Sequence, residues 1–262
     1  MPELPDVELF RRHLDATSLA ARIGEVEVRS DRIVKERSPE RLTSELRRRS
    51  FESTRRHGKH LFVHLDDGRA LALHFGMTGR LHGLTEDDEE PKHTQLLVRF
   101  ENGRALALVM PRKLGGVELV EDVDAFIDEH SLGPDAASEA FDWSAFSAAM
   151  SQRRGTVKGV LMNQEVMAGI GNVYSDEILF QAGLHPRRRV GELDDEALRE
   201  LFETTRRVLR ASIDHDADPA RLEGSFLLAH REQGAACPRC GGEVERIEVA
   251  GRSAYYCPSC QS

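Results

Sequence analysis

The chain has 262 residues with 36 basic and 45 acidic side chains, a formal net charge of −9, and 40% of its residues are hydrophobic. That length can bury a substantial core, in one large domain or in two to three smaller ones. No apolar run approaches the ~20 residues of a membrane-spanning helix and no charged-then-apolar leader opens the chain, so we expect an intracellular, cytoplasmic protein without membrane attachment.

The chain starts Met-Pro-Glu-Leu-Pro-Asp, and the spacing of Val7, Phe10 and Leu14 predicts an amphipathic helix directly afterwards. If Met1 is removed, Pro2 becomes a terminal secondary amine beside a carboxylate. Such an amine can attack a sugar C1′ and form a cationic iminium, which acidifies the C2′ proton and permits β-elimination. Glu3 could then move protons. Taken alone the pattern is weak, because chain termini are usually mobile and uninvolved in chemistry.

Residues 62–74 and 97–109 echo each other and predict two β-hairpins, each turning at an Asp-Gly or Asn-Gly pair. With a further strand over residues 23–28, they predict a β-sandwich within residues 1–130. The loops that follow the hairpins, residues 76–80 and 110–115, carry bulky and basic side chains. We expect both loops to leave the same sheet edge and to form one functional surface, here called the working surface.

A second region starts near residue 131, where Leu-Gly-Pro-Asp-Ala has loop chemistry, and the pattern is helical to about residue 215. Within it, residues 168–174 place two glycines before Asn172, which is predicted to cap the next helix. The turn is consistent with an ordinary helix-turn-helix, or with glycine-freed backbone N–H groups that hold a phosphate at the helix N-terminus. Residues 187–189, three arginines, are most simply a solvated surface run.

All four cysteines lie near the end of the chain with the spacing C-x2-C-x16-C-x2-C. This spacing is typical of a closed, structural Zn²⁺ site rather than of disulfides, and it predicts one zinc ion per chain. The predicted ligands are Cys237, Cys240, Cys257 and Cys260. Residues 242–256 between the two cysteine pairs predict a small hairpin that turns near Ala250, with Arg252 close to its tip.

Local charge departs from the acidic total. Residues 41–60 carry seven Lys and Arg against two acids, and residues 151–190 carry six against three. Acidic residues gather elsewhere, notably in residues 86–90, which read as a solvated loop. Because binding to a polyanion depends on the local field, composition does not exclude a nucleic-acid partner.

Four motifs in order make the chain resemble the bifunctional DNA glycosylases of the formamidopyrimidine-DNA glycosylase and endonuclease VIII type. The resemblance covers essentially the whole length. The motifs are an N-terminal catalytic sequence, a lysine-bearing hairpin, a helix-two-turns-helix signature and a zinc-finger ending, carried by residues 2–5, 58–61, 169–177 and 251–261. The resemblance implies a multi-domain fold with α and β structure: an N-terminal catalytic β-sandwich (1–130), a helical helix-two-turns-helix DNA-binding domain (131–232) and a four-cysteine zinc finger (233–262).

The resemblance also implies roles for individual residues. Pro2 would be the nucleophile and Glu3 the acid/base, with Lys59 beside them in the catalytic set. His74, Asn172 and Arg252, together with Lys59, would grip phosphates around the extruded nucleotide. The wedge that fills the gap left by a flipped base would consist of Met77, Arg112 and Leu114. The implied partner is damaged double-stranded DNA, bound by a monomer.

The sequence departs from the family pattern in ways that bear on the lesion. Met110 and Leu114 stand where Asp and Phe are usual, and Asp6 stands where Glu is more usual. Residues 219–234 replace a longer glycine-rich loop that covers a flipped 8-oxoguanine. Leu4 resembles the purine-type enzymes, whereas the short loop favours oxidised pyrimidines, so the sequence leaves both lesion classes open.

We therefore expect a base-excision-repair DNA glycosylase with AP lyase activity that nicks the strand by β- and δ-elimination. The alternative is a non-catalytic protein that binds damaged or structured DNA on the same scaffold. A sequence-specific zinc-finger regulator is disfavoured, because one finger reads few bases and nothing in the sequence indicates a dimer.

Overall fold

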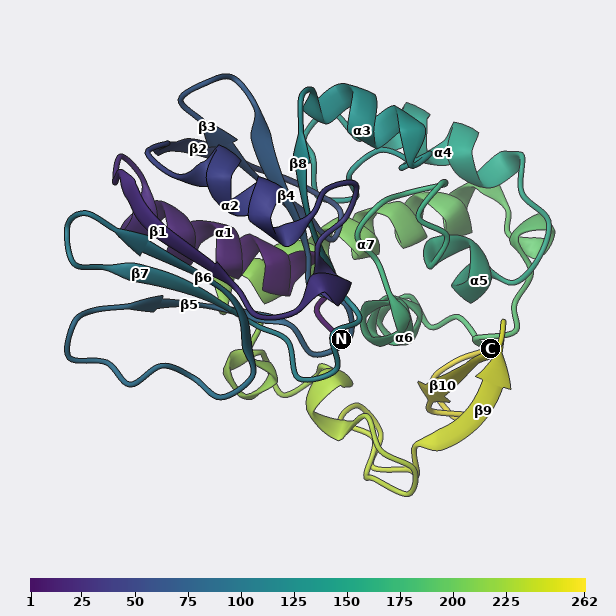
Figure 1. Ribbon diagram of the computed structural model, residues 1–262. Coiled ribbons are helices and arrows are strands. Elements are labelled where there is room, and N and C mark those ends of the chain that lie inside the picture. Colours follow the sequence, from purple (N-terminus) through teal and green to yellow (C-terminus); the bar gives the residue numbers. More distant parts are fainter. The chain divides into compact units, whose positions relative to one another are not determined.

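The computed structural model describes residues 1–262, which form two compact units (Figure 1). The N-terminal unit comprises residues 1–2 and 6–130, and the C-terminal unit comprises residues 3–5 and 131–262. The chain start therefore contributes to both units. No helix is both long and apolar enough to cross a membrane.

The N-terminal unit contains two four-stranded antiparallel sheets. One has the order β1-β6-β7-β5 and the other β2-β3-β4-β8. The strands are β1 (Ile23–Val28), β2 (Phe51–His57), β3 (His60–Leu65), β4 (Ala70–His74), β5 (Arg80–Leu84), β6 (Thr94–Phe100), β7 (Ala105–Val109) and β8 (Gly116–Val120). Both predicted hairpins are present, and their turns need glycine because Gly68 and Gly103 have φ of +87° and +82°.

Side chains from both sheets share one core, which confirms the predicted sandwich. Leu71 and Val117 of one sheet pack in the same buried cluster as Leu96 and Leu106 of the other. Val7 from the first helix joins this cluster. The helices of this unit are α1 (Leu4–Ser18), whose first two residues lie in the other unit, α2 (Pro39–Leu46), α3 (Val123–Glu129) and the short η1 (Asp31–Ile33).

The two loops of the expected working surface do come together, but not from one sheet edge as predicted. Strands β4 and β7, which precede them, belong to different sheets. The loops meet at Gly76, where a Cβ atom would lie 2.6 Å from the backbone of Leu114 and Gly115. Only glycine permits this approach, and its φ of +58° is also a conformation that favours glycine.

The C-terminal unit is helical and ends in a two-stranded hairpin. Its elements are α4 (Trp143–Ser151), α5 (Val157–Leu161), α6 (Asn172–Gln181), η2 (Val190–Glu192), α7 (Asp195–Asp214), η3 (Pro219–Arg221), η4 (Leu228–His230), β9 (Glu245–Val249) and β10 (Arg252–Tyr256). Every residue of α6 from Tyr174 to Phe180 is buried. This helix therefore lies inside the unit, where α5, α7, η4 and β10 pack against it.

Candidate active site and metal centre

Pro2 lines a cavity of about 280 Å³ in the N-terminal unit. The cavity is also lined by Met1, Asp6, Phe10, Met77, Thr78, Gly79 and Arg80. With Met1 in place the Pro2 nitrogen belongs to a peptide bond and is not nucleophilic. Removal of Met1 would expose a secondary amine in this cavity, close to one of the predicted wedge residues.

Glu3, the next residue, is fully buried in the C-terminal unit. Its carboxylate accepts hydrogen bonds from the backbone N–H groups of Gly171 at 2.7 Å, Val173 at 2.8 Å and Tyr174 at 3.2 Å. These N–H groups open α6, where a helix leaves its donors unpaired and favours negative charge. Glu3 is thus held rigidly, although it lies at a chain terminus.

This arrangement corrects two predictions about the glycine turn. Of the two interpretations left open for this turn, the one in which its backbone N–H groups hold a phosphate is wrong for the N–H groups of Gly171, Val173 and Tyr174, because Glu3 accepts from them. Asn172 does not cap α6, because Gly171 occupies the N-cap position and Asn172 is the first helical residue. A Cβ on Gly171 would lie 2.4 Å from the Glu3 carboxyl carbon, so glycine is required here to admit the carboxylate.

The Asn172 side chain remains a candidate for binding DNA. Its Oδ1 atom is buried and has no hydrogen-bond partner. Such a group costs about 1–3 kcal/mol when left unsatisfied, and functional sites are where natural proteins retain such costs. Because an amide oxygen accepts hydrogen bonds, the unmet Oδ1 would pair with a donor from a ligand; a contact with a phosphate would instead use the Nδ2 amide group.

Lys59 and His74 lie in the sheet β2-β3-β4-β8. Lys59 is in the β2–β3 turn after Gly58, and His74 ends β4 opposite His60, with ring centroids 4.9 Å apart. Burial, and secondarily the charge of Lys59, lowers the pKa of His74. His74 is therefore neutral at pH 7, so it could contact a phosphate through an N–H donor but not as a cation.

The predicted wedge residues lie in the two loops that meet at Gly76. Apart from Met1, Met77 and Leu114 are the exposed large hydrophobic residues of the chain, at 43% and 55% exposure. Arg112 is also exposed. Met110 is only 1% exposed and packs in the sandwich core, which explains why an apolar residue is accepted where the family usually has Asp.

The four cysteines form a cluster that fits a zinc ion. Their Sγ atoms all lie within 4.8 Å of one another, with 3.9 Å between Cys237 and Cys260 and 3.5 Å between Cys240 and Cys257. Tetrahedral Zn²⁺ with bonds of about 2.3 Å requires sulfur separations of about 3.8 Å. The hairpin between the pairs turns at Ala250 and Gly251, and Arg252 follows, exposed, as predicted.

Sequence reasoning missed Asp176, a buried connector on α6. Its Oδ1 accepts from Lys158 Nζ at 2.5 Å, and its Oδ2 accepts from Arg231 Nε at 2.8 Å and from the Tyr255 backbone N–H at 3.2 Å. Burial raises the pKa of Asp176 and lowers that of Lys158, against their mutual attraction. One carboxylate therefore joins α5, the segment before the finger and strand β10, which starts at Arg252.

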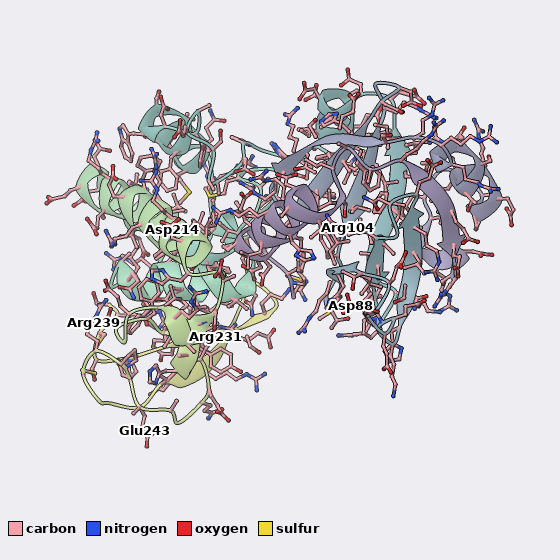
Figure 2. The ribbon with its side chains drawn as sticks, turned by 90° about the vertical axis from the view of Figure 1, so that its left-hand side faces the viewer. Asp88, Arg104, Asp214, Arg231, Arg239 and Glu243 are labelled. Carbon is pink, nitrogen blue, oxygen red and sulfur yellow. The ribbon has the colours of Figure 1, made fainter.

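Glu177 is a second connector that was missed. It accepts from the Leu228 backbone N–H and from Gln181 Nε2, both at 2.7 Å. Arg239, between the first two cysteines, donates to Gln181 at 3.2 Å, and Figure 2 labels both Arg239 and the Asp176 partner Arg231. Burial raises the pKa of Glu177 to about 7. The signal available in the sequence was two adjacent acids within an otherwise apolar helix, because such acids must be buried and paired.

Three family models together match most of the chain. A formamidopyrimidine-DNA glycosylase N-terminal domain matches residues 1–117, and the H2TH domain of the same glycosylase matches residues 132–223. A zinc finger found in FPG and IleRS matches residues 234–262.

Curated relatives and solved structures agree with these matches. Proteins named formamidopyrimidine-DNA glycosylase from Herpetosiphon aurantiacus and Heliobacterium modesticaldum are each 36% identical, with all of both chains covered. The Lactococcus lactis glycosylase bound to DNA containing an AP site has a TM-score of 0.89 at 29% identity, with 99% of each chain covered. The same protein in complex with FAPY-dG DNA has a TM-score of 0.88 at 29% identity, over 99% of this chain and all of that one.

Proposed function

The chain belongs to the formamidopyrimidine-DNA glycosylase family, and on that basis we propose that it removes oxidised bases from double-stranded DNA and nicks the strand as an AP lyase. The observation that supports this proposal most directly is the anchoring of the chain start. Termini are usually mobile, but Glu3 is fully buried and held by three backbone N–H groups. A terminus ordered in this way can position a reactive amine one residue before it.

In the proposed reaction the Pro2 nitrogen forms a bond to C1′ while the bond from C1′ to the base breaks, and the base leaves with a proton. Sugar-ring opening gives an iminium, which acidifies the C2′ proton. Loss of that proton expels the 3′ phosphate, and a second elimination expels the 5′ phosphate. Water then releases Pro2 from the sugar fragment. Glu3 is proposed to transfer protons at the sugar, and Lys59 is proposed as the third member of the catalytic set.

We assign DNA binding to the other predicted site residues. His74, Asn172 and Arg252 contact phosphates, and Met77, Arg112 and Leu114 enter the space vacated by the flipped base. A wedge is supported by the position of Met77 and Leu114, which are exposed and lie in the two loops that meet at Gly76. Zinc, held by the four cysteines, folds the finger and takes no part in the reaction.

For the lesion we propose oxidised purines. Related solved structures carry FAPY-dG and carbocyclic 8-oxo-G in their DNA, and the curated relatives are named for formamidopyrimidine. Oxidised pyrimidines, which the short loop over residues 219–234 had kept open, become the alternative that the substrate panel below tests. We further propose that residues 1–130, 131–232 and 233–262 act as three modules of a monomer that works on DNA in the cytoplasm.

Borohydride trapping tests the proposal. Duplexes carrying 8-oxoguanine, formamidopyrimidine, an oxidised pyrimidine or an abasic site are incubated with the protein, and covalent adducts are measured. We expect adducts with the purine lesions and the abasic site, and none with Pro2→Gly or with a form that retains Met1. If no duplex yields an adduct although Met1 is absent and zinc is bound, the protein binds DNA without catalysis and the proposal is wrong.

A further inference from the structure

In the C-terminal unit, the segment just before α5 runs side by side with the segment just before η2, although the two are distant in sequence. The Val157 N–H donates to the Arg188 carbonyl at 2.8 Å, and the Val190 N–H donates to the Gly155 carbonyl at 3.0 Å. Thr156 and Arg189 form an antiparallel bridge between them. This pairing joins two basic runs into one surface, here called the five-arginine surface: Arg153, Arg154, Arg187, Arg188 and Arg189.

The five-arginine surface is poorly neutralised. All five residues are exposed, and only Arg188 has an acidic partner, Glu192 at 3.6 Å. Of the three acids within residues 151–190, Asp176 and Glu177 are buried and engaged elsewhere. Burial therefore removes negative charge from this part of the protein surface and leaves the arginines facing solvent.

Some other exposed or half-exposed arginines of the chain pair with carboxylates. Arg49 approaches Asp67 at 3.1 Å, and Arg55 approaches Asp124 at 2.8 Å. In a chain with a net charge of −9, acidic partners are plentiful. A cluster of like charges that has almost none of them favours an anionic ligand from outside the protein.

The surface adjoins an element that carries a proposed phosphate contact. A Cβ on Gly159 of α5 would lie 3.1 Å from Thr156 Oγ1 and 3.4 Å from Ala250 Cβ. Ala250 is in the turn of the finger hairpin, two residues before Arg252. The paired segments, α5 and the hairpin tip are thus neighbours within one unit, and α5, β9 and β10 can be followed in Figure 1.

We propose that the five-arginine surface binds the phosphate backbone of duplex DNA outside the lesion, as a lesion-independent contact continuous with Arg252. The inference depends on the proposed function only in taking DNA as the ligand. Arginine suits this role because its planar guanidinium donates to phosphate oxygens and stays charged at any working pH. Continuity with Arg252 favours a nucleic acid over an acidic protein.

The test compares two variants with the same change in charge. The first is the triple variant Arg153→Gln, Arg154→Gln, Arg187→Gln, which leaves intact the backbone pairing of the two segments. The control is Arg206→Gln, Arg207→Gln, Arg210→Gln on α7, where Glu203 and Asp214 flank the arginines around a shallow hollow. Kd for undamaged duplexes of about 12 and about 40 base pairs is measured from about 50 to about 200 mM salt.

The log of the association constant falls as log salt rises, and on the long duplex we expect this slope to become shallower by about 2 to 3 in the first variant. Each lost phosphate contact removes about 0.9 from the steepness. The change in Kd over that salt range becomes about 40-fold smaller. The control variant leaves the slope within about 0.5 of the wild type. The rate of excision from a short lesion duplex at saturating protein stays within about twofold of wild type, because the surface takes no part in the chemistry.

Three outcomes would overturn the inference. An unchanged slope in the first variant means that no phosphate is bound there. An equal change in the control means that only net charge matters. Loss of binding to an Asp- and Glu-rich peptide with an unchanged DNA slope assigns the surface to a protein partner. Failure of the wild type to excise any base, with the slope difference intact, contradicts the proposed function and leaves this inference standing.

Discussion

Helices α6 and α7 lie in the same unit but use their acidic residues in opposite ways. On α6, Asp176 and Glu177 are buried and hold segments from four other parts of the unit. On α7, the acids face solvent with the arginines, and Asp214 at its end is labelled in Figure 2. The comparison teaches that, within this unit, the acids of the buried helix connect other segments, whereas the acids of the helix with a solvent-facing side do not.

The consequence for function is that α6 connects predicted site residues that lie at different places in the unit. Through α6, the Glu3 carboxylate at one end of the helix is linked to strand β10 of the finger hairpin, which starts at Arg252. A change at Asp176 or Glu177 therefore reaches residues that touch neither of them. Changes on the exposed face of α7 have no such route.

Of the changes considered, removal of zinc should destabilise α6 and its partners most. Structural zinc supplies about 10–16 kcal/mol of folding free energy in small fingers, and Phe180 of α6 packs in the cluster that contains Cys237 and Cys257. Chelation should release one zinc ion per chain, measured with a chromogenic dye. Hydrogen exchange at Tyr255 should accelerate, while the α7 amides stay protected; unchanged exchange at Tyr255 would contradict the structural role of zinc.

Asp176→Asn should be the most damaging single substitution on α6. It leaves Lys158 and Arg231 without their shared carboxylate, and breaking a buried pair in this way costs about 3–5 kcal/mol. Urea unfolding would measure the loss. Adding Lys158→Met should recover part of the stability, because it removes one uncompensated charge; a loss below about 1 kcal/mol would show that the network is not a connector.

Glu177→Gln should change how stability depends on pH. Burial raises the Glu177 pKa from 4.5 to about 7, while Gln181, the Leu227 and Leu228 N–H groups and Arg239 oppose this shift. Between these values the folded protein keeps a proton that the unfolded chain has lost, so stability falls as pH rises. The glutamine variant does not titrate.

As pH rises from about 4.5 to about 7.5, the free energy of unfolding of the Glu177→Gln variant should therefore increase, relative to that of the wild type, by at most about 3 kcal/mol. Denaturation of both proteins at several pH values measures the difference. A difference that stays constant over this range would mean that Glu177 is ionised throughout.

Glu203→Gln on α7 should have the smallest effect. Glu203 is exposed and no ion pair holds it, so the substitution should change stability by less than about 0.5 kcal/mol. Thermal unfolding beside Asp176→Asn provides the direct comparison. A loss as large as that of Asp176→Asn would remove the distinction between the two helices.

Much of the architecture could be predicted from the sequence because its signals are local. The Asp-Gly and Asn-Gly turns of the two hairpins, the cysteine spacing and the finger turn before Arg252 each depend on a few neighbouring residues. The family motifs located Pro2 and Glu3 in the same way. Their catalytic and DNA-binding roles, like those of the other site residues, remain predictions.

What only the tertiary structure decided was which distant groups share one environment. The sequence could not show that Glu3 would take the N–H groups of α6, because the two are separated by 168 residues or more and either water or a phosphate could satisfy those donors. Nor could it assign β4 and β7 to different sheets, or join residues 153–157 to 187–190. Local patterns determine turns, helices and metal ligands, whereas hydrogen-bond partners and the net charge of a surface follow from which side chains packing buries.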